Sequence, residues 1–205
     1  DGILQNLFSE GQYLSLEGLD LYKKIEDNLN SPSFAPIFSK FLEQPFKIIC
    51  LKLLSLFCKP EIAKKVALRL KLSRKEVEFI LKMLSNKDRM LDLCKDNLNF
   101  SERAVTSLLR DLKDDLYPSL ILVISYYPSA QSYCLEMGNY YSHVFKQKMG
   151  HLPLITGDDL IKEFHLVPSP LFKKILTTIE EMFLNGTINS KEEALKKVSE
   201  LLNKD

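Results

Sequence analysis

Apolar side chains recur at the spacing of amphipathic helices along almost the whole chain, and no segment reads convincingly as a strand. Two runs, residues 46–58 and 117–127, are apolar on nearly every side, which favours buried central helices. The other expected helices begin near residues 19, 34, 60, 74, 102, 129, 157, 168 and 191. The pattern therefore predicts an all-α fold, a multi-helix array of about ten to twelve helices.

Several of these helices carry start signals that pair with free backbone N–H groups. Ser73 with Glu76, and Ser190 with Glu193, match the capping box, in which serine and glutamate cap the first turn together. Gly18 is expected to interrupt the chain just before the first helix. Further start and stop signals are Pro60, Ser101, Thr156 and the Asn185–Gly186 pair.

A change of pattern near residues 148–153 predicts two domains. A long helix is expected to end at about Met149, and a turn-rich segment follows it. No fixed-period repeat and no low-complexity linker interrupts the chain elsewhere. The sequence therefore predicts a larger helical body, residues 1–150, and a smaller helical tail domain, residues 151–205.

The composition favours a cytoplasmic protein without a membrane partner. The cysteines at 50, 58, 94 and 134 form no CxxC pair, which predicts buried thiols in a reducing compartment. The most apolar run, residues 45–58, is too short to span a membrane and contains Lys47 and Lys52. Because the chain begins with Asp1 and not with methionine, we expect a piece excised from a longer protein.

Residues with the spacing of a catalytic or metal site are missing from the sequence. The three histidines, His143, His151 and His165, have no ligand spacing with cysteine or with each other. The acidic pairs 114–115 and 158–159 are adjacent, so on a helix their carboxylates point in different directions. We therefore predict no catalytic residue, no metal site and no cofactor in this chain.

Positive charge is concentrated between Lys59 and Arg89. This window holds ten basic and four acidic residues, a net charge of +6, whereas the whole chain has a net charge of +1. Such a window predicts a phosphate-binding face, with ordinary solvated surface as the alternative. Residues 66–81 also have the form of a helix-turn-helix, so sequence-specific DNA binding is a further alternative.

Two closely spaced helix starts, Thr156-Gly157-Asp158-Asp159 and Pro168-Ser169-Pro170, carry a resemblance to a known family. Residues 153–198 resemble the C-terminal region of the class II tRNA nucleotidyltransferase and bacterial poly(A) polymerase family. Gly186 and the segment 190–195 fit the same pattern, whereas Ser169 stands where the family usually has glycine. Residues 67–84 are similar to the body segment of that family.

The resemblance implies a part of an enzyme that lacks its catalytic head. The Gly-Ser pair and the Asp-x-Asp metal motif of the family's head are absent from this sequence. In the family, a head that uses Mg²⁺ and CTP or ATP adds nucleotides to an RNA 3′ end, and the region resembled here holds the acceptor arm and elbow of tRNA. The resemblance leaves open whether CC, A, CCA or a poly(A) tail is added.

Helix starts with free N–H groups suit phosphate, and phosphate contacts suit a partner class that includes every tRNA. The predicted RNA phosphate contacts are Arg69, Lys71, Arg74, Lys75, Arg103, Arg110, Thr156, Gly157, Lys162, Lys173 and Lys174. The expected partners are tRNA or another RNA and a covalently linked head domain. The alternative is a helical protein–protein interaction module without an RNA role, in which residues 34–57 and 116–127 form the partner surface.

Overall fold

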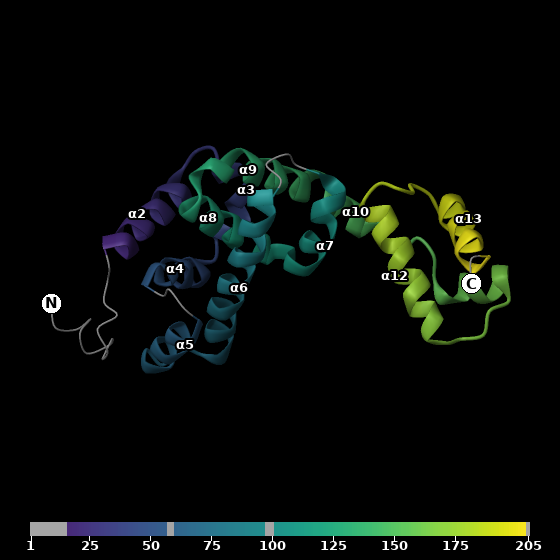
Figure 1. Cartoon of the computed structure of the whole chain (residues 1–205), viewed down its shortest axis with the longest axis horizontal. Helices are drawn as coiled ribbons and strands as arrows, with labels where there is room; N and C mark the ends of the chain where they lie inside the picture. Colours follow the sequence, from purple (N-terminus) through teal and green to yellow (C-terminus); the bar gives the residue numbers. More distant parts are fainter. Residues whose placement is uncertain (1–15, 57–59, 97–100, 204–205) are drawn as a thin grey trace. The chain divides into compact units, whose positions relative to one another are not determined.

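The computed structural model describes residues 16–56, 60–96 and 101–203 (Figure 1). These residues form helices and no strand, so the predicted all-α fold is confirmed. The described residues divide into two compact units: unit 1 comprises those up to residue 96 and residues 112–138, and unit 2 comprises residues 101–111 and 139–203. The predicted boundary near residue 150 lies within unit 2, and the division into a functional body and tail stays a prediction.

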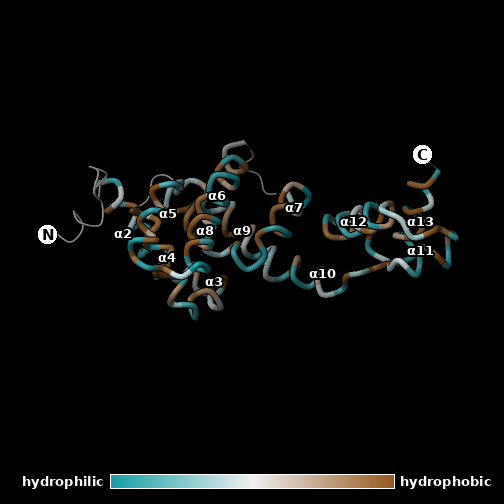
Figure 2. The backbone as a smooth tube through the Cα atoms, turned by 90° about the horizontal axis from the view of Figure 1, so that it is seen from below, coloured by the Kyte–Doolittle hydropathy of each residue, from teal (hydrophilic) through white to brown (hydrophobic). Residues whose placement is uncertain are grey.

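Unit 1 is built around one buried helix, α8 (Leu116–Tyr126). Every residue of α8 from Leu116 to Ser125 is buried, and Figure 2 shows its hydrophobic course. The central helix predicted over residues 117–127 is therefore confirmed. The helices that pack against α8 are α2 (Leu16–Asn30), α3 (Ala35–Leu42), α4 (Pro45–Leu53) and α6 (Arg74–Asp96).

The other apolar run does not form the buried central helix that its composition predicted. Helix α4 ends at Leu53 and continues as a 3₁₀ turn over Leu54–Leu56, and residues 57–58 lie outside the described part of the chain. Phe46 is 40% exposed and Ile49 is 56% exposed, because only the face of α4 with Cys50 and Leu51 is covered. Composition indicates the hydrophobicity of a segment, but neighbouring elements decide which of its faces is buried.

Helix α2 begins earlier than the sequence predicted. Gly18 does not interrupt the chain, since it lies buried in the first turn of α2. A glycine costs a helix only about 1 kcal/mol, which the apolar face that follows offsets. That face consists of Leu21, Ile25 and Leu29, whereas Leu19 is 45% exposed.

Unit 2 has a separate hydrophobic core. Its helices are α7 (Glu102–Leu112), α10 (Lys146–Gly150), α11 (Gly157–Phe164), α12 (Pro170–Leu184) and α13 (Lys191–Leu202). The core is formed by Ile155, Leu160, Ile175, Ile179, Phe183, Ile188, Ala194 and Val198. These residues come from α11, α12, α13 and the segments beside them, so the short helices are held by shared burial and not by their own propensity.

The predicted long helix over residues 129–149 is present but is not uniform. It consists of a 3₁₀ turn at Pro128–Ala130, α9 (Gln131–Tyr140), a π-helical segment at Tyr141–Phe145 and α10. The π-helical segment places both Tyr141 and Phe145 in the interior, with ring centroids 5.8 Å apart. A π segment inserts one extra residue into a helix and rotates the faces that follow.

Local sequence signals mark several of the helix starts. Pro60 opens α5 (Pro60–Arg69), and the Ser73–Glu76 capping box forms, with the Glu76 N–H donating to Ser73 Oγ at 3.4 Å. The second capping box forms only in part. Ser190 Oγ accepts from the N–H of Glu193 at 3.2 Å, but the Glu193 carboxylate accepts from Asn189 instead of Ser190.

The cysteines that the structure describes lie in the interior. Cys50, Cys94 and Cys134 are buried free thiols, and Cys58 lies outside the described residues. Burial raises the pKa of the Cys50 thiol to about 11, which keeps it protonated and unreactive.

Among the described helices, none is long and apolar enough to cross a membrane.

Candidate nucleic-acid interface

Four exposed cations surround the turn between α5 and α6; Arg69, Lys71, Arg74 and Lys75 are called the basic turn below. Helix α5 ends in hydrogen bonds from Lys71 N–H to Leu68 O and from Leu72 N–H to Ala67 O, both 3.0 Å. This is the Schellman arrangement, which requires a left-handed residue after the helix. Lys71 takes that position with φ of 55°, where glycine is the usual residue.

The side chains of the basic turn lie in solvent. The guanidinium of Arg74 donates to Glu78 at 2.7 Å, yet 92% of its side-chain surface remains exposed. The Glu78 carboxylate also raises the pKa of Arg74, so its charge is permanent. The side-chain amino groups of Lys71 and Lys75 have no hydrogen-bond or ion-pair partner among the residues that the structure describes. The turn therefore offers phosphate several cations on a fixed backbone.

The rest of the basic window has mixed roles. Lys82 donates to Asp115 at 2.7 Å, and Lys87 lies 4.6 Å from the ring centroid of Tyr126. These two lysines hold α6 against neighbouring parts of unit 1 and contribute little free charge. Lys64 and Lys65 on α5 are exposed, while Lys59 lies outside the described residues. Besides Lys82 and Lys87, the exposed cations of the +6 window in the described residues are therefore the basic turn, the two lysines of α5 and Arg89 on α6.

The start of α11 is closed by its own carboxylate. Thr156 N–H donates to Asp159 Oδ2 at 2.7 Å, and Asp159 N–H donates to Thr156 Oγ1 at 3.4 Å. Lys191 Nζ lies 2.6 Å from Asp159 Oδ1, and these contacts lower the pKa of Asp159 to about 2. The N–H of Thr156 is therefore paired with Asp159 and not free, and phosphate binding at Thr156 and Gly157 stays a prediction. A Cβ atom built at Gly157 would lie 3.5 Å from the nearest ring atom of Phe172, which is an ordinary contact distance.

The start of α12 is more open. Ser169 precedes α12 in an extended conformation, with φ of −157°, and its side chain makes no capping hydrogen bond. Lys173 and Lys174 lie exposed in the first turns of α12, and Lys162 is exposed on α11. Among the described residues, none of these three lysines has an ion-pair partner. This helix start fits the expected anion site better than that of α11.

The two arginines predicted on α7 already have partners within unit 2. The Arg110 guanidinium donates to Glu180 and lies 3.8 Å from Glu181, so it ties α7 to α12. A phosphate would have to displace a carboxylate from Arg110. Arg103 is exposed and donates to Thr187 Oγ1 at 3.2 Å, a neutral contact that leaves its charge uncompensated.

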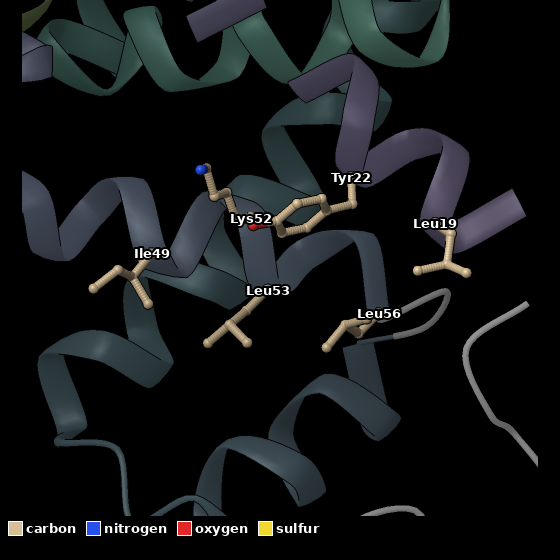
Figure 3. Close-up of a pocket in the computed structure, with 6 residues that line it drawn as sticks. All are labelled: Leu19, Tyr22, Ile49, Lys52, Leu53 and Leu56. Carbon is tan, nitrogen blue, oxygen red and sulfur yellow. The ribbon is translucent and has the colours of Figure 1, made fainter. Parts of the chain in front are cut away.

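Figure 3 shows an apolar groove in unit 1, between α2 and α4, with a volume of about 510 Å³. Its lining residues are Leu19, Tyr22, Ile49, Lys52, Leu53 and Leu56. Lys52, the charged lining residue, donates to Glu26 at 2.8 Å and lies 5.5 Å from the Tyr22 ring centroid. The groove is therefore no phosphate site. The other surface expected of a protein–protein module, residues 116–127, is buried from Leu116 to Ser125, so the prediction of a partner surface there is wrong.

Two curated proteins that the chain matches are tRNA nucleotidyltransferases. The chain is 29% identical over 207 aligned residues to a CC-adding tRNA nucleotidyltransferase of Synechocystis sp., covering 98% of this chain. It is 33% identical over 114 residues to an A-adding tRNA nucleotidyltransferase of Halalkalibacterium halodurans, covering 52% of this chain. The predicted resemblance to the tRNA nucleotidyltransferase family is confirmed. No family model matches the chain, and no solved structure matches it significantly.

The match to the tRNA nucleotidyltransferases covers only part of each relative. The chain spans 49% of the CC-adding protein and 25% of the A-adding protein. Neither relative is a poly(A) polymerase, so that part of the resemblance stays a prediction. The described residues include no group of three His, Cys, Asp or Glu side chains that fits a metal ion.

Proposed function

We propose that this chain is the RNA-binding part of a tRNA nucleotidyltransferase and positions the tRNA acceptor arm and elbow for nucleotide addition at the 3′ end. The observation that carries the proposal is the basic turn, where Arg69, Lys71, Arg74 and Lys75 lie exposed. The similarity of nearly the whole chain to a CC-adding tRNA nucleotidyltransferase supports tRNA as the polyanion. Nucleotide transfer, with CTP or ATP and Mg²⁺, belongs in this proposal to a covalently linked head domain.

The basic turn suits a partner that is bound without regard to base sequence. Lysine and arginine contacts to phosphate fix the register of a nucleic acid but carry no sequence information. An enzyme that acts on every tRNA requires such contacts. The Schellman bonds around Lys71 and the Ser73–Glu76 capping box hold the turn, so its cations are presented on an ordered backbone.

Unit 2 supplies a second set of phosphate contacts in this proposal. Lys173 and Lys174 follow an α12 start that no side chain caps, and Arg103 carries an uncompensated charge. The positive end of the α12 dipole and the two lysines act in the same direction on an anion. Arg110 is left out, since Glu180 and Glu181 already neutralise it.

Fluorescence anisotropy with labelled tRNA tests the basic turn. The double variant Arg74→Glu/Lys75→Glu should bind tRNA at least about tenfold more weakly at low salt, because it replaces two cations with two anions. Its helical circular dichroism should equal that of the unchanged chain, since both side chains lie in solvent.

The matched control is Lys23→Glu/Lys24→Glu on α2, which makes the same change in net charge at another pair of adjacent exposed cations. This control should retain most of the affinity. An equal loss in both double variants would mean that net charge governs binding, and unchanged affinity in Arg74→Glu/Lys75→Glu would exclude the basic turn.

A further inference from the structure

The turn between α11 and α12 presents an aliphatic side chain to solvent. Val167 is 79% exposed, more than any other large hydrophobic side chain in the described part of the chain. Ile161 and Leu171, on the two flanking helices, are 41% and 36% exposed. Single exposed aliphatic residues are common on protein surfaces, so the backbone and the surrounding charge decide whether this one carries meaning.

The backbone that holds Val167 is constrained on both sides. His165 ends α11 in a left-handed conformation, with φ of 53°, and its N–H donates to Ile161 O at 3.0 Å. Pro168 and Pro170 have a fixed φ and restrict the residues before them, Val167 and Ser169. Leu166 and Phe172 pack against the core of unit 2. Val167 is thus displayed on an ordered turn, and a contact through it loses little conformational entropy.

The charge around Val167 indicates an anionic partner. Lys162, Lys173 and Lys174 are exposed, and none has an ion-pair partner among the described residues. Glu163 is also exposed on α11, so the excess of positive charge lies toward α12. A partner that matches both the aliphatic tip and the lysines must offer a flat apolar face beside negative charge, and a nucleobase next to its phosphates does so.

We propose that Val167 contacts the face of an exposed nucleobase in folded RNA while Lys173 and Lys174, in the first turns of the helix that follows, bind the adjoining phosphates. This inference rests on the proposed function and deepens it by assigning a contact that is not electrostatic. An uninterrupted duplex stacks its base faces internally, whereas folded RNA exposes base faces in loops and at helix ends. The contact therefore favours folded RNA over a plain duplex.

The salt dependence of tRNA binding by the full 205-residue chain separates the two kinds of contact. Val167→Ser should weaken binding about three- to tenfold at every salt concentration and leave the slope of log affinity against log salt unchanged. Lys173→Ala/Lys174→Ala should make that slope shallower by between 1 and 2 units, about 0.7 to 0.9 for each lost phosphate contact. Val167→Phe should strengthen binding about twofold or more, since an aromatic ring stacks better on a base, and misfolding does not produce such a gain.

Ile49→Ser is the matched control, because Ile49 is 56% exposed on α4 and lies in the apolar groove of unit 1. It should bind tRNA like the unchanged chain. This inference would be overturned if both Val167 variants bound tRNA as tightly as the unchanged chain while Lys173→Ala/Lys174→Ala bound more weakly. That result would leave the proposed function standing. An unchanged chain that binds tRNA no better than duplex DNA would overturn both.

Discussion

Lys191, the first residue of α13, places its Nζ atom 2.6 Å from Oδ1 of Asp159, in the first turn of α11. The same carboxylate accepts the N–H of Thr156, so one side chain caps α11 and joins it to α13. Because unit 2 is a set of short helices, such links fix the arrangement in which its core packs.

This arrangement predicts a pH dependence of stability. The contacts lower the pKa of Asp159 to about 2 in the folded chain, against about 3.9 in an unfolded one. Their contribution is therefore complete above about pH 4 and is lost as the pH falls through about 2. Urea unfolding followed by circular dichroism should show that Asp159→Asn lowers stability at pH 7 and flattens its change between pH 4 and 2. The same pH profile in both proteins would contradict the assignment.

Lys71 combines an unfavourable backbone conformation with a proposed binding role, and a substitution can separate the two. Lys71→Gly should raise the free energy of unfolding by up to about 1 kcal/mol, because glycine takes φ of 55° without a steric cost. The same substitution should weaken tRNA binding, since it removes a cation from the basic turn. Lys71→Asn, which also tolerates the left-handed conformation, controls for the backbone. Binding that is unchanged in both variants would remove Lys71 from the interface.

Gly138 on α9 lies against side chains of two other helices of unit 1. A Cβ atom at this position would lie 2.8 Å from Cγ2 of Ile37 and 3.3 Å from Cδ1 of Leu120. Gly138→Ala should therefore lower the free energy of unfolding by about 1–3 kcal/mol in a urea titration. Gly150→Ala is the control, because nothing lies within 4 Å of a Cβ there. Equal stabilities of the two variants would show that the helices can separate at Gly138 without cost.

Arg110 should act in stability and not in RNA binding. Its ion pairs with Glu180 and Glu181 are half-buried, with 31% of the arginine side chain exposed. Arg110→Ala should lower the free energy of unfolding by about 1 kcal/mol, and Glu180→Ala should lower it less when Arg110 is already absent. The tRNA affinity of Arg110→Ala should stay within about twofold of that of the unchanged chain. A large loss of affinity without a loss of stability would restore Arg110 as a phosphate contact.

Features that depend on near neighbours in sequence could be predicted. The capping box of Ser73 and Glu76 needs only a serine and a glutamate three positions apart, and it forms as expected. The burial of α8 follows from a segment that has no polar face. The basic turn is exposed because its cations follow one another around a single helix end.

Features that depend on distant residues could not be predicted. The Thr156 cap was expected from the local sequence. The ion pair between the Asp159 carboxylate of that cap and Lys191 was not, because Lys191 lies 32 positions further along the chain. The partner of Arg110 lies 70 positions away, and nothing in the local pattern distinguishes this arginine from Arg103. The exposure of Val167 could not be predicted, because an apolar residue in a helical chain suggests burial. The conformation of the turn decides that this side chain is exposed.

One measurement tests the proposed RNA-binding role of the chain before any substitution is made. It is the affinity of the unchanged chain for labelled tRNA and for duplex DNA of equal length, each over a range of salt concentrations. We predict tighter binding to tRNA, with a slope of log affinity against log salt of about −3 or steeper, since the basic turn contributes four cations. Binding that does not weaken with salt, or that favours duplex DNA, would contradict the proposed function.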